Sequence, residues 1–314
     1  MSKFMVTGGA GFIGSHIVEL LVEKKHEVVV YDNFSSGRES NIAPFADKIS
    51  IVNGDIRDFD NLLSAMDGVE YVIHHAAEVS AIKSVEEPEL ANDVNVNGTL
   101  CVLRAARDKK AKRLIIASSS AIYGDTGKNP QSELNLPNPL SPYGATKICG
   151  EHYCSVFNEI YCLQTVRLRY FNVYGPRQNP KSQYAAVIPK FIDCILNGDD
   201  IHIYGDGEQT RDFVYVKDVA NANYIACIHD NAAGEVFNIA SGRSVSVNEL
   251  AAMLLKITGK NVKVIHDPPK LGEIKYSASV TTKAKEILDY IPQVTLEQGL
   301  AEVVSYLSDI KNKS

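Results

Sequence analysis

The sequence predicts an α/β protein with a doubly wound parallel sheet and a smaller C-terminal α/β lobe that binds the substrate. Three observations support this prediction: short apolar strands alternate with helical patterns in the first half, a glycine-rich turn follows the first strand, and the alternation stops after Tyr170. With 314 residues, of which 45% are hydrophobic, the chain is long enough for one large α/β domain and a smaller one.

The alternation in the first half is typical of a parallel sheet that is covered by helices on both faces. The expected strands are Phe4–Thr7, Glu27–Tyr31, Ile49–Val52, Tyr71–His74, Arg113–Ala117 and Gln164–Arg169. The expected helices between them are Ile13–Lys24, Phe59–Met66, Asp93–Asp108 and Tyr143–Tyr161.

Turn residues interrupt this pattern in the second half. Loops are expected at 175–180 and 205–208, and the last third mixes short strands with a helix at Val247–Thr258. We expect residues 1–172, rejoined by about 212–240, to form the large cofactor-binding domain. Residues 173–211 and 241–314 are expected to form the smaller lobe at the strand ends, where ligands of open parallel sheets bind.

The charge balance and the cysteine pattern exclude several classes of function. A formal net charge of −6 and a pI near 5.8 leave no basic surface for nucleic acid or anionic lipid, so neither is expected as a partner. No apolar segment suits a signal peptide or a membrane span, so we expect a cytoplasmic protein without membrane association. Because the cysteines lack the paired spacing of metal ligands, we expect no metal and reduced thiols at Cys101, Cys149, Cys154, Cys162, Cys194 and Cys227.

A dinucleotide fingerprint is expected at the first strand-to-helix turn. Gly8, Gly11 and Gly14 follow a strand and open a helix, so the backbone and the helix N-terminus can approach a pyrophosphate, as in a Rossmann-type fold. Asp32 ends the next strand and favours a free ribose 2′-hydroxyl over a 2′-phosphate, hence NAD over NADP. Two alternatives stay open: Arg38 can accommodate a phosphate or be an ordinary loop arginine, and the glycines can form a tight turn without a ligand.

Tyr143 and Lys147 stand four residues apart at an expected helix start, so their side chains share one helical face. A free tyrosine has a pKa near ~10, and bringing it to neutrality needs a shift of about 3 units, or roughly 4 kcal/mol. Lys147 and the positive nicotinamide ring of an oxidised cofactor can together supply this shift. Tyr143 then becomes a base for a hydroxyl proton; the alternative is a tyrosine that only packs at the helix start.

A run of three serines is expected beside this pair. Ser118, Ser119 and Ser120 follow an apolar strand directly, which places their hydroxyls at the carboxyl end of the sheet. For Ser118 and Ser119, hydrogen bonding to backbone groups at the strand end is an equally good interpretation. We expect Ser120 to be the catalytic hydroxyl.

Several motifs together resemble the extended short-chain dehydrogenase/reductase family over nearly the whole chain, and within it the UDP-sugar 4-epimerases. Besides the glycines, Asp32 and Tyr143-x-x-x-Lys147, they are Gly54–Asp58, His75–Ala77, Asn95–Thr99 and Ser118–Ser120. The resemblance implies NAD as cofactor and Ser120, Tyr143 and Lys147 as catalytic residues. The implied cofactor-binding residues are Gly8, Gly11, Phe12, Ile13, Gly14, Asp32, Asn33, Ser35, Ser36, Gly37, Asp55, Ile56, His75, Ala76, Ala77, Asn95, Ser118, Tyr143, Lys147 and Tyr170.

The same resemblance implies a UDP-sugar substrate, tightly bound NAD and a transient 4-keto sugar that receives its hydride back on the other face. Asn172 and Arg211 match diphosphate-binding positions, and Lys270 stands where a second arginine is usual. The small Ser277 leaves room for an N-acetyl group, so UDP-glucose, UDP-galactose, UDP-GlcNAc and UDP-GalNAc are expected substrates. The implied substrate-binding residues are Val79, Ser119, Ser120, Tyr143, Asn172, Ala186, Val187, Tyr204, Arg211, Lys270 and Ser277.

The resemblance further implies a homodimer that packs the helices at Asp93–Asp108 and Tyr143–Tyr161 against their copies. Alternatives within the family are a UDP-glucuronate 4-epimerase, which needs a group that holds a carboxylate, a sugar-nucleotide dehydratase, a decarboxylase and a reductase. The dehydratases and decarboxylases usually carry acidic residues just after the catalytic hydroxyl, where this chain has Ala121 and Ile122. A dinucleotide sensor without activity is a further alternative, but it has no need of a matched base and cation.

Overall fold

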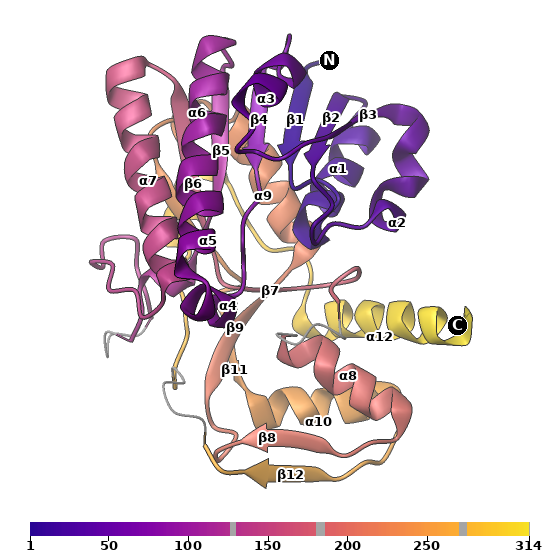
Figure 1. Cartoon of the computed structure of the whole chain (residues 1–314). Coiled ribbons are helices and arrows are strands. Elements are labelled where there is room, and N and C mark those ends of the chain that lie inside the picture. Colours follow the sequence, from indigo (N-terminus) through magenta and orange to yellow (C-terminus); the bar gives the residue numbers. More distant parts are fainter. Residues whose placement is uncertain (126–129, 180–185, 270–274, 314) are drawn as a thin grey trace.

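The computed structural model describes residues 1–125, 130–179, 186–269 and 275–313, and its largest element is a seven-stranded parallel sheet (Figure 1). The strand order is β10-β6-β5-β4-β1-β2-β3, so the direction of winding reverses between β1 and β4. This confirms the predicted doubly wound α/β fold. The strands are β1 (Lys3–Thr7), β2 (Glu27–Asp32), β3 (Ile49–Asn53), β4 (Tyr71–His74), β5 (Arg113–Ser119), β6 (Gln164–Tyr170) and β10 (Val236–Ile239).

Helices cover both faces of this sheet because successive residues of its strands supply two separate cores. In β1, Phe4 and Val6 belong to the core that includes α1 (Phe12–Glu23) and α9 (Val216–Ile228). Met5 belongs to the opposite core, which includes α3 (Phe59–Ala65), α6 (Thr99–Asp108) and α7 (Pro142–Tyr161). A parallel sheet that is buried on both faces needs apolar residues on both sides of its strands.

A smaller part of the molecule lies beneath the carboxyl ends of the large sheet in Figure 1. Here β7 (Asn172–Tyr174), β9 (Thr210–Tyr215) and β11 (Ser244–Ser246) form one sheet, and β8 (Ile201–Tyr204) pairs with β12 (Val264–Asp267). Their own apolar core includes side chains of α8 (Val187–Asn197), α10 (Val247–Thr258) and α12 (Leu296–Lys313). The sequence marks the start of α10 with a capping box between Ser246 and Glu249.

The chain crosses between the two parts more than once. α9 and β10 return to the large sheet. α11 (Thr282–Leu288) also packs in the core beside α9, although it falls within the range expected for the smaller lobe. We propose the division into 1–172 with 212–240 and 173–211 with 241–314 as the domain organisation, with α11 docked on the larger domain.

The helix expected over Asp93–Asp108 is not uniform. Asp93–Gly98 form a π-helical turn and only Thr99–Asp108 are α-helical, an irregularity that is frequent near functional sites. In the described ranges, no helix is long and apolar enough to cross a membrane. The remaining short elements are α2 (Glu39–Ile42), α4 (Ala81–Glu86), α5 (Pro88–Asn92) and 3₁₀ turns at Ala43–Lys48, Ser120–Ile122 and Asp230–Ala232.

Candidate active site

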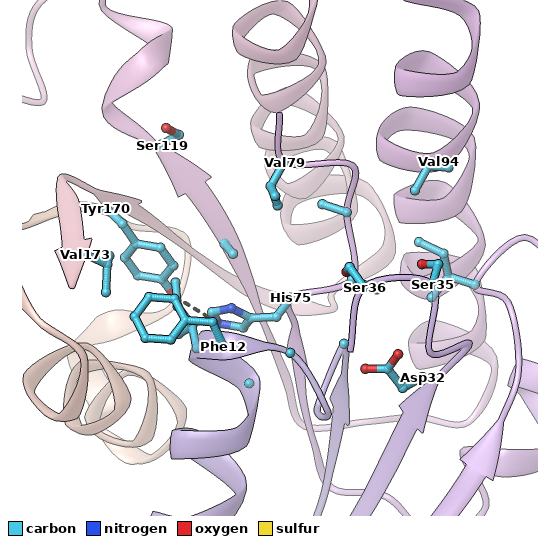
Figure 2. Close-up of a pocket in the computed structure, with 18 of the residues that line it drawn as sticks. Phe12, Asp32, Ser35, Ser36, His75, Val79, Val94, Ser119, Tyr170 and Val173 are labelled. Carbon is cyan, nitrogen blue, oxygen red and sulfur yellow. Dashed lines mark hydrogen bonds between the residues drawn. The ribbon is translucent and has the colours of Figure 1, made fainter. Parts of the chain in front are cut away.

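A pocket at the carboxyl ends of the central strands collects most of the predicted site residues (Figure 2). The predicted residues that line this pocket are Gly8, Gly11, Phe12, Ile13, Gly14, Asp32, Asn33, Ser35, Ser36, Asp55, Ile56, His75, Ala76, Ala77, Val79, Ser118, Ser119, Tyr143, Lys147, Tyr170 and Ala186. The predicted residues that do not line it are Gly37, Asn95, Ser120, Asn172, Val187, Tyr204, Arg211 and Ser277. Lys270 lies outside the described residues.

The glycine turn after β1 leaves space for the phosphates of a dinucleotide. Gly8 has a φ of 68°, and a Cβ there would lie 2.7 Å from the backbone nitrogen of Ala76. A Cβ at Gly14 would overlap the carbonyl oxygen of Gly8. Gly11 caps α1 without a side-chain hydrogen bond, so the N–H groups of the first helical turn stay available to a ligand. The residues present therefore fit a bound pyrophosphate.

Asp32 lies at the end of β2 and borders the pocket, as predicted. Its carboxylate accepts hydrogen bonds from the backbone N–H groups of Ala10 at 2.9 Å and Phe34 at 2.8 Å. Burial raises the pKa of Asp32, and these hydrogen bonds partly offset the rise. A Cβ at Gly37 would lie 2.9 Å from Oδ1 of Asp32, so Gly37 shapes the site by its close approach to the carboxylate. Arg38 lines the same pocket.

A second carboxylate, that of Asp55, also borders the cofactor site. Arg57 donates hydrogen bonds to Asp55 and lowers the pKa of that carboxyl to about 2. Nδ2 of Asn33 donates to the same group at 3.1 Å. Asp55 is therefore charged at neutral pH, beside the buried Ile56.

Tyr143 and Lys147 both reach the pocket from the start of α7, as their spacing predicted. Nζ of Lys147 lies 5.7 Å from the centre of the Tyr143 ring and donates a hydrogen bond of 2.9 Å to the carbonyl oxygen of Ala117. Burial lowers the pKa of Lys147 to about 8. Burial also raises the pKa of Tyr143, opposite to the shift that a base requires. Lys147 by itself therefore does not offset the burial of the phenol.

Ser119, and not Ser120, is the serine that the structure places beside Tyr143. A hydrogen bond with the Ser119 hydroxyl partly offsets the effect of burial on the pKa of Tyr143. β5 continues to Ser119, two residues beyond the expected Arg113–Ala117, and Ser120 begins a 3₁₀ turn outside the pocket lining. Ser120, the expected catalytic hydroxyl, therefore does not lie beside Tyr143, because β5 is longer than expected and brings Ser119 to the pocket instead.

A buried ion pair lies behind the serines and was not predicted. Ser118 donates a hydrogen bond of 2.5 Å to Oε1 of Glu151, whose carboxylate pairs with Nε and Nη2 of Arg169 at 2.9 and 2.7 Å. Arg169 also donates to the hydroxyl of Tyr123, which donates to Asn238 at 2.6 Å. Ser118 therefore anchors the end of β5 to α7 and β6, in addition to bordering the pocket. In the sequence, Glu151 stands four residues after Lys147 on the same helical face, and this spacing is a signal for its position near the site.

A stacked pair of rings forms another wall of the pocket. The rings of His75 and Tyr170 have centroids 5.6 Å apart (Figure 2). Both contact Oδ1 of Asn223 on α9, with distances of 3.2 Å from His75 Nε2 and 2.9 Å from the Tyr170 hydroxyl. Burial lowers the pKa of His75 to about 4, so its imidazole is neutral at pH 7. Nothing in the local sequence pattern around Asn223 pointed to this role.

Asn95 supports the pocket from behind and does not line it. Its side chain exchanges two hydrogen bonds with the backbone of Glu78, at 2.8 and 2.9 Å. Its Nδ2 also donates to Oγ1 of Thr146 at 3.0 Å. Asn95 therefore ties the loop after β4 to α7, whereas direct contact with the cofactor had been expected.

The predicted sugar-nucleotide residues are distributed over both parts of the molecule. β7 and β9 pair in parallel and carry Asn172 and Arg211. The backbone N–H of Ser277 donates to the carbonyl oxygen of Thr210 at 3.1 Å, so the segment that carries Ser277 runs beside β9. Tyr204 ends β8 and Val187 begins α8. The structure brings Asn172, Arg211 and Ser277 onto neighbouring segments, beyond the lining of the cofactor pocket.

Comparison with known proteins identifies the family to which the chain belongs. A model of the NAD dependent epimerase/dehydratase family matches residues 4–240. The chain belongs to this family. Its cofactor is accordingly NAD, as the glycine turn and Asp32 predicted. The resemblance drawn from the sequence motifs is thereby confirmed.

Individual relatives of the chain match it over almost its whole length. A putative UDP-glucose 4-epimerase of Methanocaldococcus jannaschii is 42% identical over 308 residues, 97% of this chain and 98% of the relative. The crystal structure of the Thermotoga maritima UDP-glucose 4-epimerase with UDP-glucose is 40% identical, has a TM-score of 0.94 and covers 98% of this chain and 99% of that one. The UDP-N-acetylglucosamine 4-epimerase of Methanobrevibacter ruminantium, in complex with UDP-N-acetylmuramic acid, is 39% identical with a TM-score of 0.95 and the same coverage.

Proposed function

We propose that the protein is a UDP-hexose 4-epimerase that inverts C4 of the sugar through a transient 4-keto form. The observation that supports this most directly is the convergence of Ser119, Tyr143 and Lys147 on the pocket that also contains the glycine turn. A hydroxyl, a phenol and an ammonium at one end of an NAD site suit the removal of a hydroxyl proton during hydride transfer.

The residues of the chain orient the sugar and move its proton. A bound NAD would supply the hydride acceptor and donor for C4, at the pocket that the glycine turn and Asp32 border. The phenol oxygen of Tyr143 accepts the proton of the 4-hydroxyl and returns it at the end, while the Ser119 hydroxyl hydrogen-bonds the same sugar oxygen. Lys147, fixed by the carbonyl of Ala117, keeps a positive charge beside Tyr143. Because the proton and the hydride both return, only the configuration at C4 changes.

The ionisation of Tyr143 depends on charge near the pocket. Burial raises its pKa, and a cation brought close to the phenol lowers the pKa again. The oxidised nicotinamide ring carries such a charge, so we expect Tyr143 to act as a base only in the NAD-loaded protein. This property couples proton removal to the presence of the hydride acceptor.

We propose that the substrates include UDP-glucose and UDP-galactose, and also UDP-GlcNAc and UDP-GalNAc. Ser277, a small half-buried residue next to β9, leaves room for an N-acetyl group. The two crystallised relatives are a UDP-glucose and a UDP-N-acetylglucosamine epimerase, and both resemble this chain equally well in fold. A dehydratase needs an additional acid and base, whereas Ser119 is followed by Ser120 and Ala121, neither of which is a carboxylic acid.

We further propose a homodimer that packs through the outer face of α7. Val156 and Ile160 expose 47% and 70% of their surface on this helix, and Tyr153 and Tyr161 lie beside them. Apolar side chains that recur at helical spacing on an exposed face are typical of a helix that is covered by a partner. A second copy with the same face completes such an interface symmetrically.

The test of this function needs no added cofactor. Purified protein is incubated separately with UDP-glucose and UDP-GlcNAc, and the 4-epimers are quantified by chromatography. The Tyr143→Phe variant is the matched control, since it removes only the proton acceptor. We expect conversion by the wild type and none by the variant; conversion of neither sugar by the wild type would contradict the proposal.

A further inference from the structure

The segment that leaves β7 contacts α1 and lies below α1 and α2 in the view of Figure 1. We call residues 175–179 the strap. The carbonyl oxygen of Pro176 lies 3.0 Å from Nε2 of His16. Arg177 donates hydrogen bonds to Oε2 of Glu19 at 2.7 Å and to Oγ of Ser15 at 3.3 Å. Three contacts, to Ser15, His16 and Glu19 of the same helix, therefore hold the strap in place.

The backbone of the strap is fixed in an unfavourable conformation. Arg177 has a φ of 69°, in the left-handed region that a residue with a side chain rarely adopts. Gly175 is packed so closely that a Cβ there would overlap the side chain of Val216. A backbone of this kind persists only where its surroundings hold it, and such sites are commonly functional.

The Arg177–Glu19 pair is charged and shielded from water. The side chains of Arg177 and Glu19 are only 15% and 28% exposed. The contact with His16, whose Nδ1 lies 3.5 Å away, and the Arg177 guanidinium lower the pKa of Glu19 to about 2 against the effect of burial. The carboxylate therefore keeps its charge throughout the working range of pH.

The strap forms one wall of the NAD pocket. Arg177, Gln178 and Asn179 line it together with Gly11 and Phe12. Gly11 and Phe12 stand at the start of α1, where the pyrophosphate binds, and Ser15 and Glu19 follow on the same helix. The contacts of the strap are therefore made by the same helix whose N-terminus would face the phosphates.

We propose that the Arg177–Glu19 ion pair is a latch that retains NAD by holding the strap across the pyrophosphate end of the pocket. Release of the cofactor then requires the pair to break. The inference rests on the NAD dependence of the family and does not depend on which sugar is the substrate. Glu19 acts through Arg177 and is a positioning residue, because it does not itself line the pocket.

A different role for Arg177 makes opposite predictions. If the guanidinium only attracted the pyrophosphate directly, removing the charge of Glu19 would leave NAD binding unchanged or strengthen it. In a latch, both Arg177 and Glu19 are needed to retain NAD. Glu19 is therefore the residue whose substitution distinguishes the two.

The experiment measures NAD release from Glu19→Gln, Arg177→Gln and the double variant, with Glu23→Gln as the control for charge on an exposed position of the same helix. Each NAD-loaded protein is diluted into cofactor-free buffer, passed through a desalting column at timed intervals and denatured to quantify the NAD that remains. We expect each single variant to release NAD about tenfold faster than wild type, as for the loss of one charged hydrogen bond. The double variant should release it no faster than either single variant, because both remove the same interaction.

Unchanged release from Glu19→Gln together with faster release from Arg177→Gln would overturn the latch and assign Arg177 to direct contact with the pyrophosphate. Thermal midpoints of the NAD-free proteins separate faster release from general loss of stability. If Glu19→Gln fails to fold, Glu19→Asp is measured in its place, because it keeps the negative charge but has a shorter side chain. Wild-type release from the aspartate variant would then contradict the latch.

Discussion

Alanine substitutions at Ser119 and Ser120 separate two neighbouring hydroxyls that the sequence alone does not distinguish. Both changes remove one oxygen from residues that adjoin in the chain. Ser119 hydrogen-bonds Tyr143 and lines the pocket, whereas Ser120 begins a 3₁₀ turn outside the pocket lining. The second variant is therefore a matched control for the first.

The expected loss follows from the charge that Tyr143 and the sugar oxygen share during proton transfer. A hydrogen bond to a charged group contributes about 1.5–3 kcal/mol, which corresponds to a decrease in kcat of about 10–150-fold at 1.36 kcal/mol per decade. For Ser120→Ala we expect kcat within about twofold of the wild type, as for a substitution away from special contacts.

The assay follows epimerisation of UDP-glucose at saturating substrate across a range of pH. The hydrogen bond with Ser119 lowers the pKa of Tyr143, so its removal should shift the acidic limb of the pH profile to higher pH as well as reduce the maximal rate. A large loss in Ser120→Ala with near-normal Ser119→Ala would refute this assignment of the two serines.

Four further predictions concern Tyr143, the buried Glu151–Arg169 ion pair and the proposed dimer. Tyr143→Phe should lose turnover and keep its NAD, as measured by the absorbance of the denatured protein, and loss of NAD in parallel would point to a structural defect. In NAD-free protein Tyr143 should ionise at higher pH than a free tyrosine, since burial raises its pKa, and adding NAD should shift its ultraviolet titration to lower pH; Tyr143→Phe, which lacks this phenol, identifies its contribution to the signal. Glu151→Gln leaves Arg169 as a buried unpaired charge and should lower the free energy of unfolding by about 3–5 kcal/mol, which chemical denaturation measures; a change below about 1 kcal/mol would show that water reaches the pair. Ile160→Asp should convert the dimer to a monomer in light scattering after gel filtration, while Glu159→Gln, at the adjacent exposed position, should not; a dimer in both would place the interface elsewhere.

The fold was predictable because local signals repeat along the chain. The six strands and five helices expected from apolar alternation all occur, apart from the π-helical turn that replaces the start of one helix. The NAD site was predictable for the same reason, since Gly8, Gly11, Gly14 and Asp32 follow consecutive strands. The motif spacing also predicted that Tyr143 and Lys147 lie together at the pocket, as the structure shows.

The rest of the site depends on contacts between distant parts of the chain. A strand end that shifts by two residues changes which serine meets Tyr143, and propensity does not fix strand ends to this precision. Asn223 lies on a helix beyond the first six strands, and Arg177 meets Glu19 across 158 residues. Such pairs have no periodic pattern that a single sequence can reveal.

The return of α9 to the large sheet has a consequence for how the protein is made. One face of β1, β5 and β6 exposes apolar residues such as Phe4, Ile115 and Val166 until α9 covers them. Since α9 begins at Val216, the first six strands leave the ribosome well before α9, which covers this face, has been synthesised. During synthesis this half-covered sheet is a surface for chaperones or for aggregation, and completion of the chain past β10 ends that exposure.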